Sequence, residues 1–163
     1  MRVLLQRVAR ARVSVGDEEV GAIDRGLLLL AGVTHEDGPD EAELLAAKIA
    51  NLRVFPDPAG QMNRSLLDLR GGGEPVGVMV VSQFTLYADA RKGRRPSFVR
   101  AARPEQAEPL VAHLVAVMRA LGLTVAEGRF GATMAVESVN DGPVTLWLDT
   151  AHLRPAGPPA AGE

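Results

Sequence analysis

The alternation of apolar and polar positions predicts a chain rich in β-strands. Two uninterrupted apolar runs, at residues 27–32 and 76–81, are typical of strands that are buried on both faces. Val13 and Val15 alternate with polar neighbours, as in a strand with one exposed face. The other expected strands lie at residues 2–8, 20–23, 124–126, 134–139 and 144–148, with a strand stub at 53–55. Turn residues separate the first strands, which indicates an antiparallel meander.

Two segments have the periodicity of amphipathic helices. In residues 41–51 and just beyond, Leu45, Ile49 and Leu52 recur at i, i+4 and i+7, and Pro39 stands where a helix can begin. A longer helix is predicted to start at Pro104 and to stop at Gly122. Its apolar stripe consists of Ala107, Leu110, Val111, Leu114, Val115, Met118 and Leu121. Residues 61–70 are ambiguous, although a helical turn at 66–67 is compatible with the pattern.

This order of elements predicts an α/β fold. A chain of 163 residues is long enough for one domain with a proper core. We expect a compact single domain of three layers, with two β-sheets and two main helices packed on one face. The domain is predicted to span residues 1–149 and to be followed by a flexible C-terminal tail at 150–163, because residues 156–163 are rich in Pro, Gly and Ala.

Charge and composition exclude several classes of site. The chain has no cysteine, so disulfides, thiolate nucleophiles and zinc–thiolate sites are excluded and a reducing cytosol is permitted. No apolar run is long enough for a signal peptide or a membrane span, so we expect a cytoplasmic protein without membrane contact. The net charge of −2 gives no case for nucleic acid binding by the whole surface, but Arg91-Lys92-Gly93-Arg94-Arg95 is a basic cluster in the long polar loop 88–102.

Common catalytic and cofactor motifs are missing from the sequence. His35, His113 and His152 are scattered without partners at ligand spacing, so no metal site is expected. The sequence contains no Walker loop and no Gly-x-Gly-x-x-Gly motif, and no cofactor is expected. What remains is a site of hydroxyl, amide and backbone groups, which suits hydrogen bonding and electrostatic stabilisation.

The segment Val80–Tyr87 offers such groups at the end of a buried strand. The apolar run gives way to Ser82, Gln83 and Thr85, which suits a pocket floor. On this segment alone, hydroxyls that satisfy the local backbone are the favoured interpretation. Further along, Gly142-Pro143 suits either a turn between two strands or a stiff backbone wall close to a ligand, and the residues alone favour the turn.

Taken together, Ser82-Gln83-Phe84-Thr85-Leu86 and Asn140-Asp141-Gly142-Pro143-Val144-Thr145 resemble the D-aminoacyl-tRNA deacylase family. Four shorter segments resemble the same family in the same order: Leu5-Gln6-Arg7-Val8, Gly26-Leu27-Leu28, Arg95-Pro96-Ser97-Phe98 and Gly128-Arg129-Phe130. The resemblance covers roughly residues 1–149. It implies a homodimer of three-layer α/β subunits, with an active site at the subunit interface that cleaves a D-amino acid or glycine from the terminal adenosine of tRNA.

The resemblance also implies roles for individual residues. Gly142 and Pro143, joined by a cis bond, are expected to form a chiral wall that reaches into the partner's pocket and is braced by Arg7. The remaining expected site residues are Ser82, Gln83, Phe84 and Thr85 in the catalytic pocket and Phe130 and Met134 near the adenosine. A wall close to the substrate Cα would reject L-amino acids by steric exclusion and ignore side-chain identity.

Thr85 is the obvious nucleophile, but nothing in the motif supplies a base to activate it. We therefore expect backbone N–H groups near Phe84 and Thr85 to polarise the ester, assisted by the ribose 2′-hydroxyl of the tRNA. Lys92, Arg94 and Arg95 are expected to contact acceptor-stem phosphates, with a solvated loop as an equal alternative. A non-catalytic module that binds the tRNA end, or an editing deacylase with relaxed chirality, remain the alternative functions.

Overall fold

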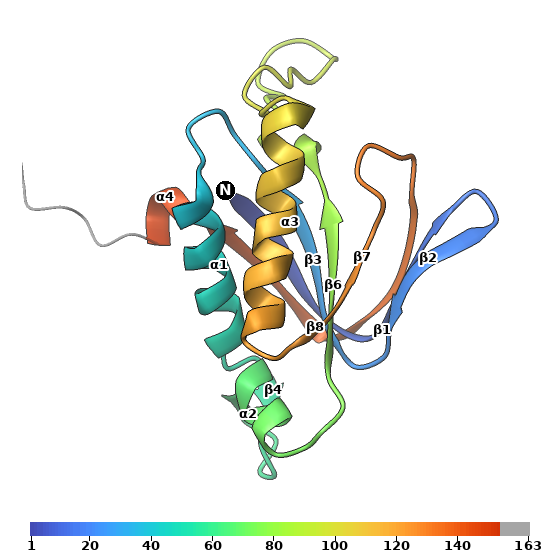
Figure 1. The fold of residues 1–163 in the computed structure, drawn as a ribbon, viewed down its shortest axis with the longest axis vertical. Helices are drawn as coiled ribbons and strands as arrows, with labels where there is room; N and C mark the ends of the chain where they lie inside the picture. The colour runs from blue at the N-terminus through green and yellow to red at the C-terminus, as the bar shows by residue number, and fades with distance from the viewer. Residues whose placement is uncertain (154–163) are drawn as a thin grey trace, which may run out of the picture.

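The computed structural model describes residues 1–153, and its fold is organised around one long strand, β1 (Arg2–Val15). The equally long β8 (Ala135–Asp149) pairs antiparallel with β1 along its length. On the other edge, β3 (Gly26–Gly32) pairs with the first half of β1 and β2 (Glu18–Ile23) with the second half. β6 (Gly77–Ser82) and β7 (Thr124–Glu127) extend the sheet in parallel, as Figure 1 shows.

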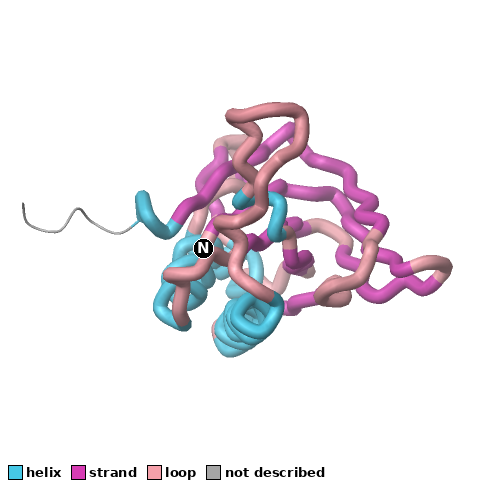
Figure 2. Tube along the Cα trace, turned by 90° about the horizontal axis from the view of Figure 1, so that it is seen from above, coloured by secondary structure: helices cyan, strands magenta, loops and turns pink. Residues whose placement is uncertain are grey.

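The helices cover one face of this sheet. The two long helices, α1 (Pro39–Asn51) and α3 (Pro104–Ala120), lie side by side over it (Figures 1 and 2). The smaller elements are α2 (Leu66–Gly71), α4 (Thr150–Leu153), the 3-10 helix η1 (Phe84–Tyr87), and a two-stranded sheet of β4 (Phe55–Pro56) and β5 (Met62–Arg64). The predicted α/β domain with a main sheet, a second sheet and two main helices is confirmed.

The uninterrupted apolar runs are explained by burial on both faces. Successive strand residues point to opposite faces, so Leu27 and Leu29 pack against the helices. Leu28 and Met79 point the other way, into a second cluster that is closed by the far half of β1 and by β2. These strands therefore need apolar residues at every position.

Two pairs of predicted strands are single strands in the structure. Residues 2–8 and 12–15 belong to β1, and residues 134–139 and 144–148 fall almost entirely in β8. The turn that we expected at Gly142-Pro143 is wrong, because the chain does not reverse there. Between Asn140 and Thr145 β8 advances five residues, while β1 advances two between Val8 and Gln6. The extra residues form a bulge, and its Gly142–Pro143 peptide is cis.

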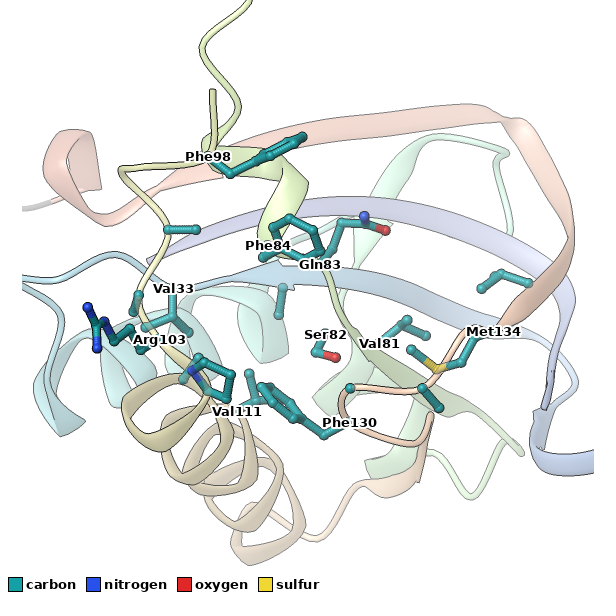
Figure 3. Close-up of a pocket in the computed structure, with 18 residues that line it drawn as sticks. Val33, Val81, Ser82, Gln83, Phe84, Phe98, Arg103, Val111, Phe130 and Met134 are labelled. Atoms are coloured by element: carbon teal, nitrogen blue, oxygen red, sulfur yellow. The ribbon is translucent and has the colours of Figure 1, made fainter. Parts of the chain in front are cut away.

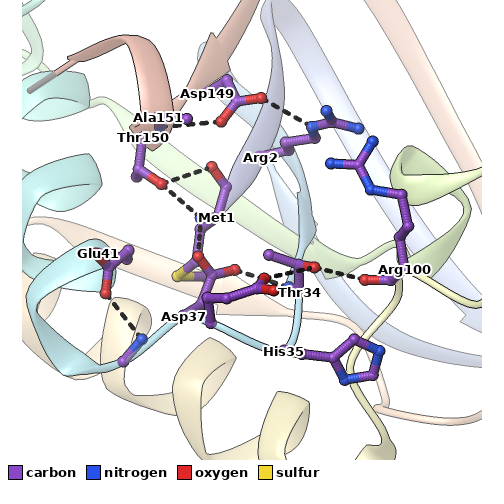
Figure 4. Close-up of polar contacts among 12 residues, drawn as sticks. Met1, Arg2, Thr34, His35, Asp37, Glu41, Arg100, Asp149, Thr150 and Ala151 are labelled. Carbon is purple, nitrogen blue, oxygen red and sulfur yellow. Dashed lines mark hydrogen bonds and ion pairs between the residues drawn. The ribbon is translucent and has the colours of Figure 1, made fainter.

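The C-terminal boundary also differs from the expectation. The predicted tail began at residue 150, but residues 150–153 form α4. Thr150 is buried, and its backbone N–H donates to the carbonyl of Met1 at 3.0 Å. Its hydroxyl accepts a hydrogen bond from the amino group of Met1 at 2.6 Å (Figure 4). The Pro-, Gly- and Ala-rich segment 156–163 lies outside the described residues. Among the described helices, none combines the length and apolarity that crossing a membrane requires.

Candidate active site

A cavity of about 570 Å³ opens at the carboxyl end of β6. Its floor is the end of β6 with residues 82–84, and one wall is residues 101–104 with the first turns of α3. The loop between β7 and β8 forms the other wall (Figure 3). The lining is mostly apolar with a few polar groups from residues 82–83, as in many small-molecule sites.

Three of the four predicted catalytic residues line this cavity. Ser82 and Gln83 are half-buried there, while Phe84 is 58% exposed and packs edge-on against Phe98 with ring centroids 5.1 Å apart. Thr85 does not line the cavity and is exposed. The side-chain amide of Gln83 donates a hydrogen bond to the Thr85 hydroxyl. Within residues 1–153, no His, Asp or Glu side chain makes a hydrogen bond to Thr85.

The strand ends at Ser82, and residues 84–87 wind into η1. The backbone N–H of Gln83 is already bonded to the Ala31 carbonyl at 2.7 Å. The N–H groups of Phe84 and Thr85 open the 3-10 helix, where donors have no partner within the helix. Of these two residues, Phe84 lines the cavity and Thr85 follows it directly in the chain.

The two predicted adenosine-binding residues, Phe130 and Met134, both line the cavity from the loop between β7 and β8 (Figure 3). Met134 lies over Gly128, where an added Cβ would be 2.6 Å from the methionine sulfur. The backbone N–H of Arg129 donates to the same sulfur at 3.3 Å. The Arg129 guanidinium pairs with Glu18 at 2.9 Å and so ties this loop to β2.

Gly142 and Pro143 do not line this cavity, and both are exposed. Arg7 donates from Nε to the Asp141 carbonyl at 3.1 Å and pairs with the Asp141 carboxylate at 3.2 Å. A second Arg7 nitrogen donates to the Val54 carbonyl at 2.6 Å. Within the bulge, the Val144 N–H donates to the Asn140 side chain at 3.1 Å. Arg7 thus holds the bulge in place through its two contacts with Asp141.

The bulge is far from this cavity. Arg7 pairs with Leu27 of β3, whereas Ser82 pairs with Ala31 of the same strand. Four residues along β3 correspond to roughly 13 Å. The bulge also lies three strands away from β6, in the order β8, β1, β3, β6, or roughly another 14 Å.

The basic cluster lies on a loop that is closed by paired backbone bonds between Asp89 and Ser97, both at 2.8 Å. Arg91 is engaged within the loop, because its guanidinium pairs with Asp89 at 2.6 Å. Hydrogen bonds from Arg91 hold the pKa of Asp89 below its usual value. For Lys92, Arg94 and Arg95, by contrast, the structure has no ion pair with any residue from 1 to 153.

Sequence reasoning missed the wall formed by residues 101–104 and by Ala107 and Val111 of α3. The sequence pattern places both α3 residues in the apolar stripe that faces the core. Nothing in that pattern distinguishes residues that line a cavity from residues that pack in the core. Residues 101–104 are positioned by Val33, whose carbonyl accepts from the Ala102 N–H at 2.9 Å. In the described part of the chain, no group of three or more His, Asp or Glu side chains is arranged to hold a metal ion.

Residues 4–149 of this chain match the protein-family model described as D-Tyr-tRNA(Tyr) deacylase. The chain belongs to this family. The deacylase resemblance seen in the sequence is thereby confirmed. A D-aminoacyl-tRNA deacylase of Thermomicrobium roseum is 58% identical over 154 residues, which cover 94% of this chain and 97% of the relative. One from Thermus aquaticus is 54% identical over 152 residues, which cover 93% of this chain and 97% of the relative.

Two solved structures share the fold. The c-Myc DNA Unwinding Element Binding Protein superposes with a TM-score of 0.82 at 40% identity, and the match covers 91% of this chain and 98% of the other. A probable eukaryotic D-amino acid tRNA deacylase gives a TM-score of 0.74 at 19% identity over 90% and 97% of the chains, which supports the fold alone. The prediction of a hydrolase family with one α/β domain is confirmed by these matches and by the relatives' names.

Proposed function

We propose that this protein hydrolyses the ester bond that joins a D-amino acid, or mischarged glycine, to the terminal adenosine of tRNA, in the cytoplasm. Family membership supports the reaction. The observation that carries the proposal is the cavity, which has a polar floor at Ser82 and Gln83 and an apolar wall at Phe130 and Met134. An adenosine that carries an aminoacyl ester matches this lining, because its base suits the apolar wall and its ester needs polar groups.

In the proposed mechanism the main chain stabilises the transition state. The N–H groups of Phe84 and Thr85 would donate to the oxyanion as water attacks the ester, and the 2′-hydroxyl of the tRNA would assist that water. The hydrogen bond from Gln83 to the Thr85 hydroxyl supports this role assignment, because it leaves Thr85 positioned by an amide instead of activated by a base. Thr85 would then orient the turn and not attack the substrate.

Gly142 and Pro143 are proposed to exclude L-amino acids. The bulge is held by Arg7 through Asp141 and by the Asn140 side chain, so its backbone can act as a fixed wall. A wall of this kind judges the configuration at the substrate Cα by steric exclusion. Side-chain identity on the D side would not matter, and glycine would pass.

The wall has to come from a second subunit. The bulge is exposed and far from its own cavity, and the outer edge of β8 pairs with no strand among residues 1–153. An open edge of 15 residues is normally covered. Phe84 and Trp147 are 58% and 50% exposed, as expected for side chains that a partner buries. We therefore propose a homodimer whose bulges enter the partners' cavities.

The decisive experiment follows the release of amino acid from matched D- and L-aminoacyl-tRNA. We expect release from the D-ester, with the L-ester left intact. Thr85→Ala should retain measurable single-turnover hydrolysis, with a loss far below the roughly 10⁶-fold that removal of a true nucleophile causes. Thr124→Ala, at the exposed start of β7, is the matched control and should behave as the unaltered protein.

Three results would contradict the proposal. Equal release of both enantiomers would contradict the proposed chiral wall and favour an editing deacylase with relaxed chirality. Binding of tRNA without hydrolysis would indicate a module that only holds the tRNA end. Complete loss of hydrolysis in a folded Thr85→Ala variant would make that hydroxyl the nucleophile. Sedimentation at the assay concentration should give a dimer, and a monomer with full chiral selectivity would rule out the shared site.

A further inference from the structure

Arg103 is the one charged residue among those that line the cavity within residues 1–153. It stands directly before α3, on the opposite side of the cavity from Met134 (Figure 3). Its side chain is exposed and makes no ion pair or hydrogen bond with any described residue. At the rim of an apolar cavity, such a cation can bind an anionic group of a ligand that extends from the cavity toward solvent.

The backbone around Arg103 is firmly held. Ala101 is bridged to Thr34, and Ala102 is bonded to Val33 at 2.9 Å. The carbonyl of Arg103 accepts from the N–H groups of Gln106 and Ala107 at 3.0 and 2.9 Å. The Arg103 side chain is therefore attached to a fixed part of the cavity wall.

We propose that Arg103 binds the phosphate on the 5′ side of the terminal nucleoside of the substrate, an inference that rests on the proposed function. A 3′-terminal nucleoside with an uncharged base and ribose has one anionic attachment, its 5′-phosphate. If the base lies against Phe130 and the 3′-ester points to Gln83, the remaining, 5′ side of the ribose faces Arg103. A guanidinium matches two phosphate oxygens at once.

This phosphate contact differs from contacts made by Lys92, Arg94 and Arg95. Those side chains lie on the loop outside the cavity lining and can meet only phosphates further along the acceptor end. Arg103 instead recognises the nucleotide that enters the cavity. It should therefore let the protein distinguish a terminal nucleotide from a free nucleoside, even when no other part of the tRNA is present.

The test compares two non-hydrolysable ligands, 3′-(D-tyrosylamino)-3′-deoxyadenosine and its 5′-monophosphate, by calorimetry with the whole protein. We expect the monophosphate to bind roughly threefold to tenfold more tightly, as a partly exposed charge-assisted pair allows. Arg103→Gln should make the two affinities equal and leave the nucleoside affinity unchanged. Arg103→Lys should restore part of the difference, since it keeps the charge without the paired donors.

Arg94→Gln is the matched control and should keep the full preference for the monophosphate. Equal binding of both ligands to the unaltered protein, or a preference that Arg94→Gln abolishes and Arg103→Gln preserves, overturns the inference. The proposed function survives either result as long as D-aminoacyl-tRNA is cleaved. If neither ligand binds and D-aminoacyl-tRNA is not cleaved, the proposed function fails and the phosphate site fails with it.

Discussion

Arg2 connects the end of β8 to the turn that carries the candidate site. Its replacement should show how much these contacts contribute to the free energy of unfolding. Its Nε donates to the Asp149 carboxylate at 2.9 Å (Figure 4), and Nη1 donates to the Leu86 carbonyl of η1 at 3.0 Å. The guanidinium carbon also lies 4.4 Å from the centre of the Tyr87 ring. Arg2→Met would keep the apolar stem and remove all three contacts.

The cost of Arg2→Met can be estimated from these contacts. Asp149 is buried and, within residues 1–153, would keep only the Ala151 N–H, at 3.1 Å, as a hydrogen-bond donor. Breaking a charge-assisted hydrogen bond to a buried group costs about 1.5–3 kcal/mol, and the stacked cation adds roughly 0.5–1 kcal/mol. We expect the free energy of unfolding to fall by about 2–4 kcal/mol at pH 7 by these magnitudes.

The pH dependence gives a sharper test. Burial disfavours the charged form of Asp149, but hydrogen bonds from Arg2 and Ala151 outweigh it, so the pKa of this carboxyl is held below its usual value. A lowered folded-state pKa stabilises the protein above the unfolded-state pKa of about 3.9, and the stabilisation is lost as the pH falls through the folded-state value. Without Arg2, the carboxylate loses its largest stabilising contact and the pKa of Asp149 rises. The deficit of Arg2→Met should therefore be largest near neutral pH and shrink below about pH 4.

Urea unfolding of the unaltered protein and the variant at pH 7 and pH 3.5 measures this difference. Arg12→Met is a matched control on the same strand, because the Arg12–Glu19 pair is at least half exposed on both sides and should contribute no more than about 1 kcal/mol. A deficit for Arg2→Met that equals the control, or one that is the same at both pH values, would refute the reasoning.

Two further predictions concern the sheet and the basic loop. Gly26→Ala should lower the free energy of unfolding by more than about 3 kcal/mol, since the new Cβ would lie 1.8 Å from the Gly77 carbonyl oxygen of the neighbouring strand. Gly71→Ala, with open space around it, should be close to neutral in the same urea titration. Replacing Lys92, Arg94 and Arg95 by Gln should reduce the slope of log affinity for tRNA against log salt by about 2–3, at roughly 0.9 per phosphate contact. An unchanged slope would show that the loop is only solvated.

Much of the fold could be predicted because its strands carry strong local signals. The runs at 27–32 and 76–81 are apolar at every position, which only burial on both faces allows. The long helices were predicted from their periodicity and from Pro39 and Pro104 at their starts.

The missed features depend on partners that are distant in the sequence. Whether residues 140–145 turn or bulge is decided by β1, which continues past them, and no local residue shows this. The stub predicted at 53–55 meets β4 only at Phe55, and its partner β5 is too short to leave a pattern. In the candidate site, the floor at 82–84 could be found from its polar residues, but the wall at 101–104 depends on bonds to Thr34 and Val33, which are distant in the sequence.

The position of Arg7 explains why one strand can serve both the core and the candidate site. Arg7 falls between Gln6 and Val8, where the register of β1 with β8 is interrupted and β8 carries its extra residues. A long side chain is needed there, because the bulge has left the sheet and its carbonyls have lost their ladder partners. The guanidinium replaces those partners with two contacts to Asp141, while its third contact, to Val54, anchors it in the body of the domain. The exposed Gly142–Pro143 backbone is thus supported by the same strand whose neighbouring residues Leu5 and Val8 are fully buried, so any shift of the bulge would have to disturb β1 itself.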